Sequence, residues 1–229
     1  MHPDTFRFPA PARAPAAALP ALAILALALL LAGCGIGPDR VQIESIGPGP
    51  GQGSGTGRAG GRLEHRPRLV AYRSESPTRA EILATDLPIE ALDPARGFAG
   101  LSGQITRVRM FNVPIPGRTP VSSTAGNTVV QHVVIHDGLL AVYSGSGLLR
   151  PRQRPGADPM AVVLSAGTLR LTRQSGPLED PIGTARLDLW LTAPLNAPLA
   201  TLIATRLEQV IERTQPITDP PAPDRPTRP

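Results

Sequence analysis

The chain has 229 residues with a formal net charge of +5, and 41% of them are hydrophobic but only 3% aromatic. A single Cys excludes a disulfide framework and a zinc ribbon, and any core must be built from aliphatic side chains. The 28 Pro and 23 Gly are enough to place part of the chain outside a folded domain.

The N-terminal residues have the pattern of an export signal. Arg7 and Arg13 give a positively charged start, and residues 19–32 are almost entirely Leu, Ala and Ile. An apolar run of about 14 residues suits a signal peptide. It is shorter than the roughly 20 residues that a membrane-spanning helix needs.

The apolar run ends in Leu31-Ala32-Gly33-Cys34, which resembles the lipobox of bacterial lipoproteins. In that class the Cys thiol receives a diacylglycerol, the leader is cut just before the Cys, and the new amine is acylated. The resemblance therefore implies lipidation at Cys34, and Gly35, being other than Asp, favours the periplasmic face of the outer membrane. An ordinary cleaved signal peptide and an uncleaved anchor are the alternatives.

Composition divides the chain into four segments. Residues 1–33 are the expected lipoprotein signal peptide, and 34–62 are Cys34 followed by a flexible tether rich in Gly and Pro. A coil of that length spans about 30 Å. Residues 63–214 are the expected globular domain, and 215–229 form a Pro-rich tail that we expect to be disordered.

The first part of the globular domain shows weak periodicity. Residues 69–72 are a possible strand. Thr78 and Glu81 have the spacing of a capping box, which predicts a short helix over 78–85. We expect a loop over 86–101 and a strand over 105–113.

The second part has stronger signals. Asp137-Gly138 predicts a two-residue turn that joins strands 127–136 and 139–144. Residues 161–173 form an expected strand with a bulge at 165–167, and 185–192 alternate as a half-buried strand. Asn196 caps an amphipathic helix to 213 whose apolar stripe lies opposite Arg206.

These elements predict an α+β fold, which is a mainly antiparallel β-sheet with the C-terminal amphipathic helix packed on one face. In the predicted hairpin, Val129 belongs to the core face, whereas His132 lies opposite Tyr143 on the other, half-exposed face. His132 and His136 are about 13 Å apart on a strand and cannot share a metal ion. His132 is then either a packed strand residue or a proton-transfer group beside Tyr143.

Few other residues point to chemistry. The Gly-x-Ser-x-Gly nucleophile motif is absent. Glu179, Asp180 and Asp188 are better explained as solvated residues than as a glycosidase pair.

The one charge cluster is Arg150, Arg152 and Arg154 in a Pro-bounded loop. It suits anionic headgroups, lipopolysaccharide phosphates or an acidic protein, or serves only as a linker between strands.

The sequence thus favours a binding or accessory role, such as a scaffold, in the cell envelope. The possible binding residues are Arg150, Arg152, Arg154, His132 and Tyr143. Expected partners are the membrane, through Cys34, and an envelope protein or anionic lipid. Scarce aromatic residues and export argue against nucleic acid, and we expect neither a cofactor nor a metal. Two alternatives are an envelope hydrolase around His132 and Tyr143, and a transport-system auxiliary lipoprotein that cradles lipid between sheet and helix.

Overall fold

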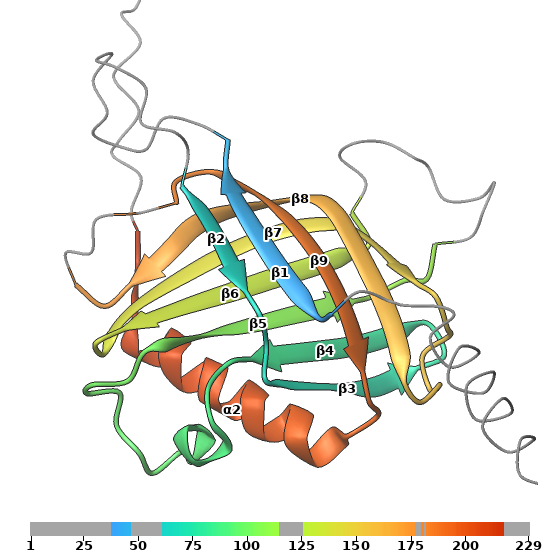
Figure 1. Ribbon diagram of the computed structural model, residues 1–229, viewed down its shortest axis with the longest axis horizontal. Helices are drawn as coiled ribbons and strands as arrows, with labels where there is room; N and C mark the ends of the chain where they lie inside the picture. Colours follow the sequence, from blue (N-terminus) through green and yellow to red (C-terminus); the bar gives the residue numbers. More distant parts are fainter. Residues whose placement is uncertain (1–37, 47–60, 115–125, 177–179, 181, 218–229) are drawn as a thin grey trace, which may run out of the picture. The chain divides into compact units, whose positions relative to one another are not determined.

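The computed structural model describes residues 38–46, 61–114, 126–176, 180 and 182–217. They form a ten-stranded antiparallel sheet, one α-helix and one short 3-10 helix (Figure 1). The strand order is β2-β1-β9-β8-β7-β6-β5-β4-β3, with β10 paired to β8. The elements are β1 (Arg40–Ser45), β2 (Arg62–His65), β3 (Leu69–Ser76), β4 (Arg79–Thr85), η1 (Ile89–Leu92), β5 (Gly103–Met110), β6 (Thr128–His136), β7 (Leu139–Pro151), β8 (Met160–Gln174), β9 (Ala185–Ala193), α2 (Ala197–Arg213) and β10 (Gln215–Pro216).

The prediction of a mainly antiparallel sheet with a C-terminal helix is confirmed. The hairpin of β6 and β7 has the predicted register, with His132 opposite Tyr143. Its turn places Asp137 and Gly138 at φ 48° and 82°, because a two-residue turn that matches the strand twist needs positive φ at both positions. The bulge in β8 is also present, as the register against β9 shifts between Leu164 and Gly167.

The predicted helix over 78–85 is wrong. These residues form β4, which pairs with β3 and β5, and Pro77-Thr78 lie in the turn before it. A strand in the middle of a sheet that is buried on both faces lacks the alternation of polar and apolar residues by which strands are recognised. β4 is such a strand, since Ala80 to Thr85 are all buried.

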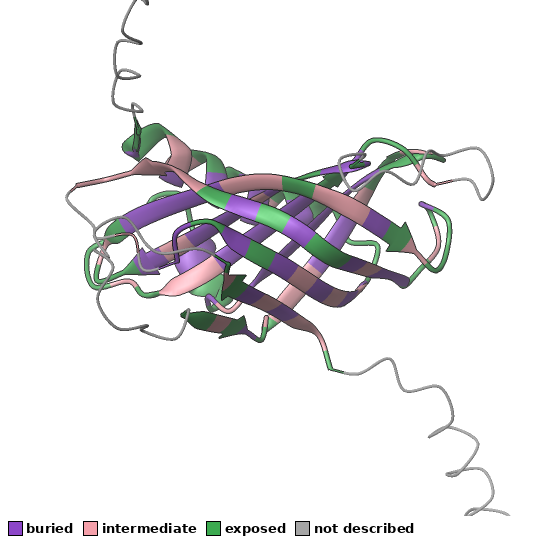
Figure 2. Ribbon diagram, turned by 90° about the horizontal axis from the view of Figure 1, so that it is seen from above, coloured by how far each residue is buried: buried purple, intermediate pink, exposed green. Residues whose placement is uncertain are grey.

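The sheet is strongly curled (Figures 1 and 2). Its inner and outer faces pack into two separate hydrophobic cores. The inner core joins side chains of β1 and β9 to those of β4, β5 and β6, including Val41, Leu189, Ile82, Val108 and Val130. The curl is also visible in a contact between the rings of His65 on β2 and His132 on β6, although four strands separate these two in the sheet. The prediction that β6 and β7 have one half-exposed face therefore fails.

The outer core lies under α2. Asn196 Oδ1 accepts a hydrogen bond from the Leu199 N–H at 3.0 Å, which confirms the predicted cap. Ile203, Leu207 and Val210 are fully buried against residues of β3 to β7, such as Leu83 and Val133. Arg206, which the sequence placed on the polar side, is also fully buried.

Both predicted flanking segments contain strands. β1 lies at 40–45, within the range predicted as tether, and pairs with β9 along its full length. β10 and the bond from Ile217 N–H to Thr172 O lie within the predicted tail. Residues 1–37, 47–60 and 218–229 lie outside the described part of the chain. Among the helices that the structure describes, none has the length and hydrophobicity to span a membrane.

Candidate functional site

Four residues form a row across the outer face of the sheet. Arg40 on β1 is directly opposite Trp190 on β9, Trp190 is opposite Val163 on β8, and Val163 is opposite Arg150 on β7. Residues directly opposite each other project from the same face of a sheet. Their chain neighbours Val41, Leu189, Leu191, Val162 and Leu149 belong to the inner core, so the row points outward. Arg150 is exposed and the other three are partly exposed.

The Arg40 guanidinium stacks on the Trp190 ring, 4.6 Å from its centroid. Arg40 and Trp190 were not identified as functional from the sequence. Arg40 lies within the range predicted as tether, and Trp190 lies within the strand predicted over 185–192. An aromatic residue on the polar side of an alternating strand is the signal by which Trp190 could have been found.

The loop between β7 and β8 places Arg152 and Arg154 beside this row. Both are exposed. The Arg152 N–H donates to Ala161 O at 2.8 Å, and the Ala161 N–H donates to Gln153 Oε1 at 2.8 Å. Further along, the Tyr72 hydroxyl donates to Ala157 O and accepts from the Gly156 N–H. Hydrogen bonds thus fix this loop, which connects β7 to β8, at its base and again at residues 156 and 157.

Two carboxylates lie close to these arginines in the chain. Each of them accepts a hydrogen bond from a backbone N–H group. Asp39 Oδ1 accepts from the Thr192 N–H at 2.7 Å, and burial raises the pKa of Asp39 despite this bond. Asp158 Oδ1 accepts from the Leu195 N–H at 2.9 Å. Neither carboxylate forms an ion pair with an arginine among the described residues. We call Arg40, Arg150, Arg152, Arg154 and Trp190 the basic end of the sheet.

His132 and Tyr143 lie inside the domain and not on a half-exposed face. His132 is fully buried, and Tyr143 is 1% exposed. His132 Nδ1 is 2.9 Å from Thr106 Oγ1, and its Nε2 has no hydrogen-bond partner within the described part of the chain. Burial, reinforced by the nearby His65, lowers the pKa of His132 to about 3. The Tyr143 hydroxyl donates to Asp180 Oδ1 at 2.9 Å, and burial together with this carboxylate raises the pKa of Tyr143.

His65 extends this buried group toward Asp86. The His65 Nδ1 lies 3.4 Å from Asp86 Oδ2, which is within ion-pair distance, although no hydrogen bond forms there. Burial alone would raise the pKa of Asp86, but His65 and the Gln104 N–H outweigh it and the net pKa is lowered. The group has the residue types of proton transfer but no open access, because both histidines are almost completely buried.

The other carboxylates considered in the sequence have structural contacts. Asp180 Oδ1 also accepts from the backbone N–H groups of Ile182 and Gly183. Asp188 accepts from the Ala166 N–H in the β8 bulge and pairs with Arg186 at 2.9 Å. Glu179 lies outside the described residues. Within those residues, no three His, Cys, Asp or Glu side chains converge as metal ligands would.

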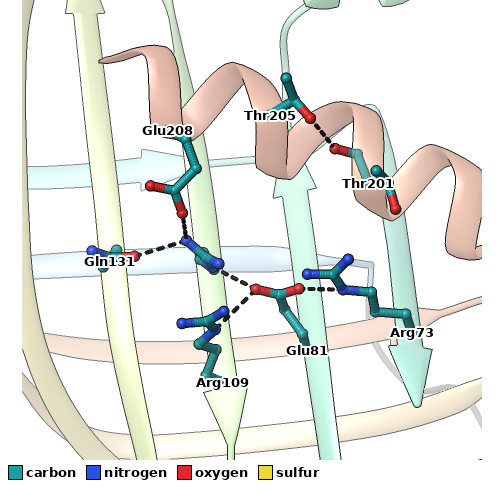
Figure 3. A network of polar contacts seen from close by, with 8 residues as sticks. Arg73, Glu81, Arg109, Gln131, Thr201, Thr205 and Glu208 are labelled. Carbon is teal, nitrogen blue, oxygen red and sulfur yellow. Dashed lines mark hydrogen bonds and ion pairs between the residues drawn. The ribbon is translucent and has the colours of Figure 1, made fainter. Parts of the chain in front are cut away.

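A second charged group ties the sheet to α2 (Figure 3). Glu81 is fully buried and accepts from Arg73 and Arg107 at 2.5 Å and from Arg109 at 3.1 Å. Arg107 also pairs with Glu208 on the helix. Burial raises the pKa of Glu81, but the bonds and charges of Arg107 and Arg73 outweigh it, so the net pKa is lowered. The fixed contacts of Glu81 indicate a structural role.

Arg206 lines a pocket of about 340 Å³ with six residues of the 91–101 segment. Its guanidinium donates to Arg96 O at 2.8 Å and to Gly97 O at 2.9 Å, and it stacks 3.9 Å from the Phe98 ring centroid. Burial, and then the charge of Arg213, lowers the pKa of Arg206. Because its donors hold the backbone of this segment, Arg206 acts as a clamp between α2 and the loop.

Comparison with protein-family models, with curated proteins and with solved structures gives no match for this chain.

Proposed function

We propose that the protein is a lipid-anchored component of the cell envelope with a binding or accessory role at the periplasmic surface of the outer membrane. The observation that carries this proposal is the distance along the chain from Cys34 to the folded domain. The lipobox-like sequence ends at Cys34, and β1 begins at Arg40. Six peptide steps span at most about 20 Å even when fully extended.

A lipid on Cys34 would therefore hold the domain directly at the membrane surface. The sequence predicted a tether of about 30 Å from the composition of 34–62. The pairing of β1 with β9 removes most of that length from the arm. A short arm supports a role beside the membrane, where the protein would meet envelope partners and lipid headgroups. Two or three acyl chains are enough for stable attachment, since one chain alone is marginal.

Neither alternative from the sequence is favoured by a specific contact. A hydrolase around His132 needs an open cleft with a carboxylate bonded to that ring, but His132 is fully buried and bonds to Thr106. A lipid cradle needs apolar space under α2, but Ile203 and Leu207 fill that position. We infer that the amphipathic stripe of α2 serves packing and not lipid binding.

Membrane fractionation of the native chain tests the proposal. Wild-type protein should remain in the membrane fraction after a high-salt wash, whereas Cys34→Ser should lose that attachment or retain its leader. Gly35→Ser is the matched control, because it changes the neighbouring residue without removing the thiol, and it should fractionate like the wild type. Release of the wild-type protein by salt alone would overturn the proposal.

A further inference from the structure

We propose that the basic end of the sheet, defined above by Arg40, Arg150, Arg152, Arg154 and Trp190, is a membrane-docking face that binds anionic lipid headgroups. This inference rests on the proposed function, because it takes the lipid on Cys34 as the first attachment point. It adds a second attachment point and assigns an orientation to the domain.

The position of the anchor relative to these residues is the first argument. The chain enters the domain at Arg40, which is itself part of the docking face. Neighbouring strands lie about 4.8 Å apart, so the Cα atoms of Arg40 and Arg150 are about 14 Å apart along the row. The short arm from Cys34 therefore brings this end of the sheet, with the adjoining Arg-rich loop, to the bilayer first.

Charge is the second argument. The docking face carries four arginines, of which Arg150, Arg152 and Arg154 are exposed. The carboxylates of Asp39 and Asp158 at this end are held by backbone N–H groups. On the next outward positions of β9, by contrast, Arg186 pairs with Asp188. Guanidinium groups bind phosphate oxygens through paired hydrogen bonds, and unpaired exposed arginines remain available for this contact.

Trp190 is the third argument. Indole rings are enriched at membrane interfaces, where an apolar ring and a polar N–H both find suitable surroundings. Trp190 is partly exposed in the middle of the row, beside Val163 and under the Arg40 guanidinium. A partly exposed indole within a basic surface fits a lipid headgroup layer better than it fits an acidic protein or a solvated linker.

The chain contains one Trp, so its fluorescence reports on this face alone. The lipidated protein would be reconstituted into vesicles of phosphatidylethanolamine and phosphatidylglycerol, and into vesicles of phosphatidylcholine, each with and without brominated acyl chains. Bromine should quench Trp190 more strongly in the anionic vesicles, and 0.5 M salt should reduce that difference. Quenching that is equal in both vesicle types, or absent from both, would overturn the docking face.

Charge removal tests the residues themselves. Each basic residue near an anionic surface contributes about 1 kcal/mol, so Arg150→Ala, Arg152→Ala and Arg154→Ala together should lower the docked-to-undocked ratio on the order of 100-fold. The matched control removes three exposed arginines elsewhere on the domain and should leave quenching unchanged. It combines Arg62→Ala, Arg79→Ala and Arg170→Ala. Equal effects of both triple variants would show general charge attraction and would refute the assignment.

Failure of this inference is distinguishable from failure of the proposed function. If the protein floats with the vesicles but Trp190 is not quenched, the anchor stands and the docking face is wrong. If the protein does not float because Cys34 carries no lipid, the proposed function itself is wrong.

Discussion

Burial of an uncharged His132 should make the domain less stable in mild acid. Desolvation lowers the pKa of His132 from an ordinary value of 6.5 to about 3 in the folded state. The unfolded chain therefore binds a proton more readily than the folded chain between these values. Since protonation favours the unfolded state, the stability contributed by neutral His132 is fully present above pH 6.5 and falls as the pH drops toward 3.

The size of the effect follows from the two pKa values. Each unit of pH below 6.5 costs about 1.4 kcal/mol until the folded pKa is reached. At pH 5 the loss relative to pH 8 is therefore about 2 kcal/mol. Glu81 and Asp86 have lowered pKa values in the folded state, so their contribution is lost only below the ordinary carboxylate range.

Urea unfolding at pH 8 and pH 5 measures this loss, and His132→Gln should remove about 2 kcal/mol of the difference. His136→Gln is the control, because His136 lies on the same strand but is exposed. Proton NMR gives an independent reading, in which the His132 ring resonances should not titrate between pH 8 and pH 5. A midpoint near 6.5, or a variant that keeps the whole wild-type difference, would refute the reasoning.

Three further substitutions test the packing. Glu81→Gln removes the buried carboxylate that pairs with Arg73, Arg107 and Arg109, and Arg107 keeps its pairing with Glu208. The substitution should cost about 3 kcal/mol in urea unfolding, and a cost below about 1 kcal/mol would contradict the network in Figure 3. Arg206→Met should cost about 1–3 kcal/mol and speed hydrogen exchange in the 91–101 segment, so unchanged exchange there would count against the clamp. Gly145→Ala places a Cβ 1.6 Å from Thr168 O and should cost at least about 3 kcal/mol by thermal unfolding. Gly97→Ala, whose Cβ meets nothing closer than 4.0 Å, should stay within about 0.5 kcal/mol, and equal costs for the two would refute the close approach.

Local signals predicted the second half of the domain well. The Asp137-Gly138 turn, the β8 bulge and the Asn196 cap each depend on residues close together in the chain, and all three are present. Such features follow from the conformational preferences of a few residues and need no knowledge of the remaining fold.

The errors all arise from contacts between distant segments. β1 lies in the segment predicted as a tether rich in Gly and Pro, and it is held by β9, about 145 residues later in the chain. The curl of the sheet brings β2 across β6, so His132 is buried by His65 and not exposed beside Tyr143. Val129 is the opposite case. It is predicted to belong to the core face, but it lies outside both cores and is 46% exposed.

In the candidate site, too, the local features are predictable from the sequence and the contacts between distant segments are not. Arg150 near the end of β7 and Arg152 and Arg154 in the β7–β8 loop stand together in the sequence and are recognised there as a charge cluster. Their proximity to Arg40 and Trp190 depends on sheet register, which composition does not specify. Arg206 was misplaced because helical periodicity does not reveal that the 91–101 segment packs over one side of α2.

Mass spectrometry of the N-terminal peptide from the native protein tests membrane anchoring most directly. We expect the peptide to begin at Cys34, with diacylglycerol on the sulfur and an acyl chain on the amine. A peptide with an unmodified Cys34 thiol, or one that still contains residues of the leader, would contradict it.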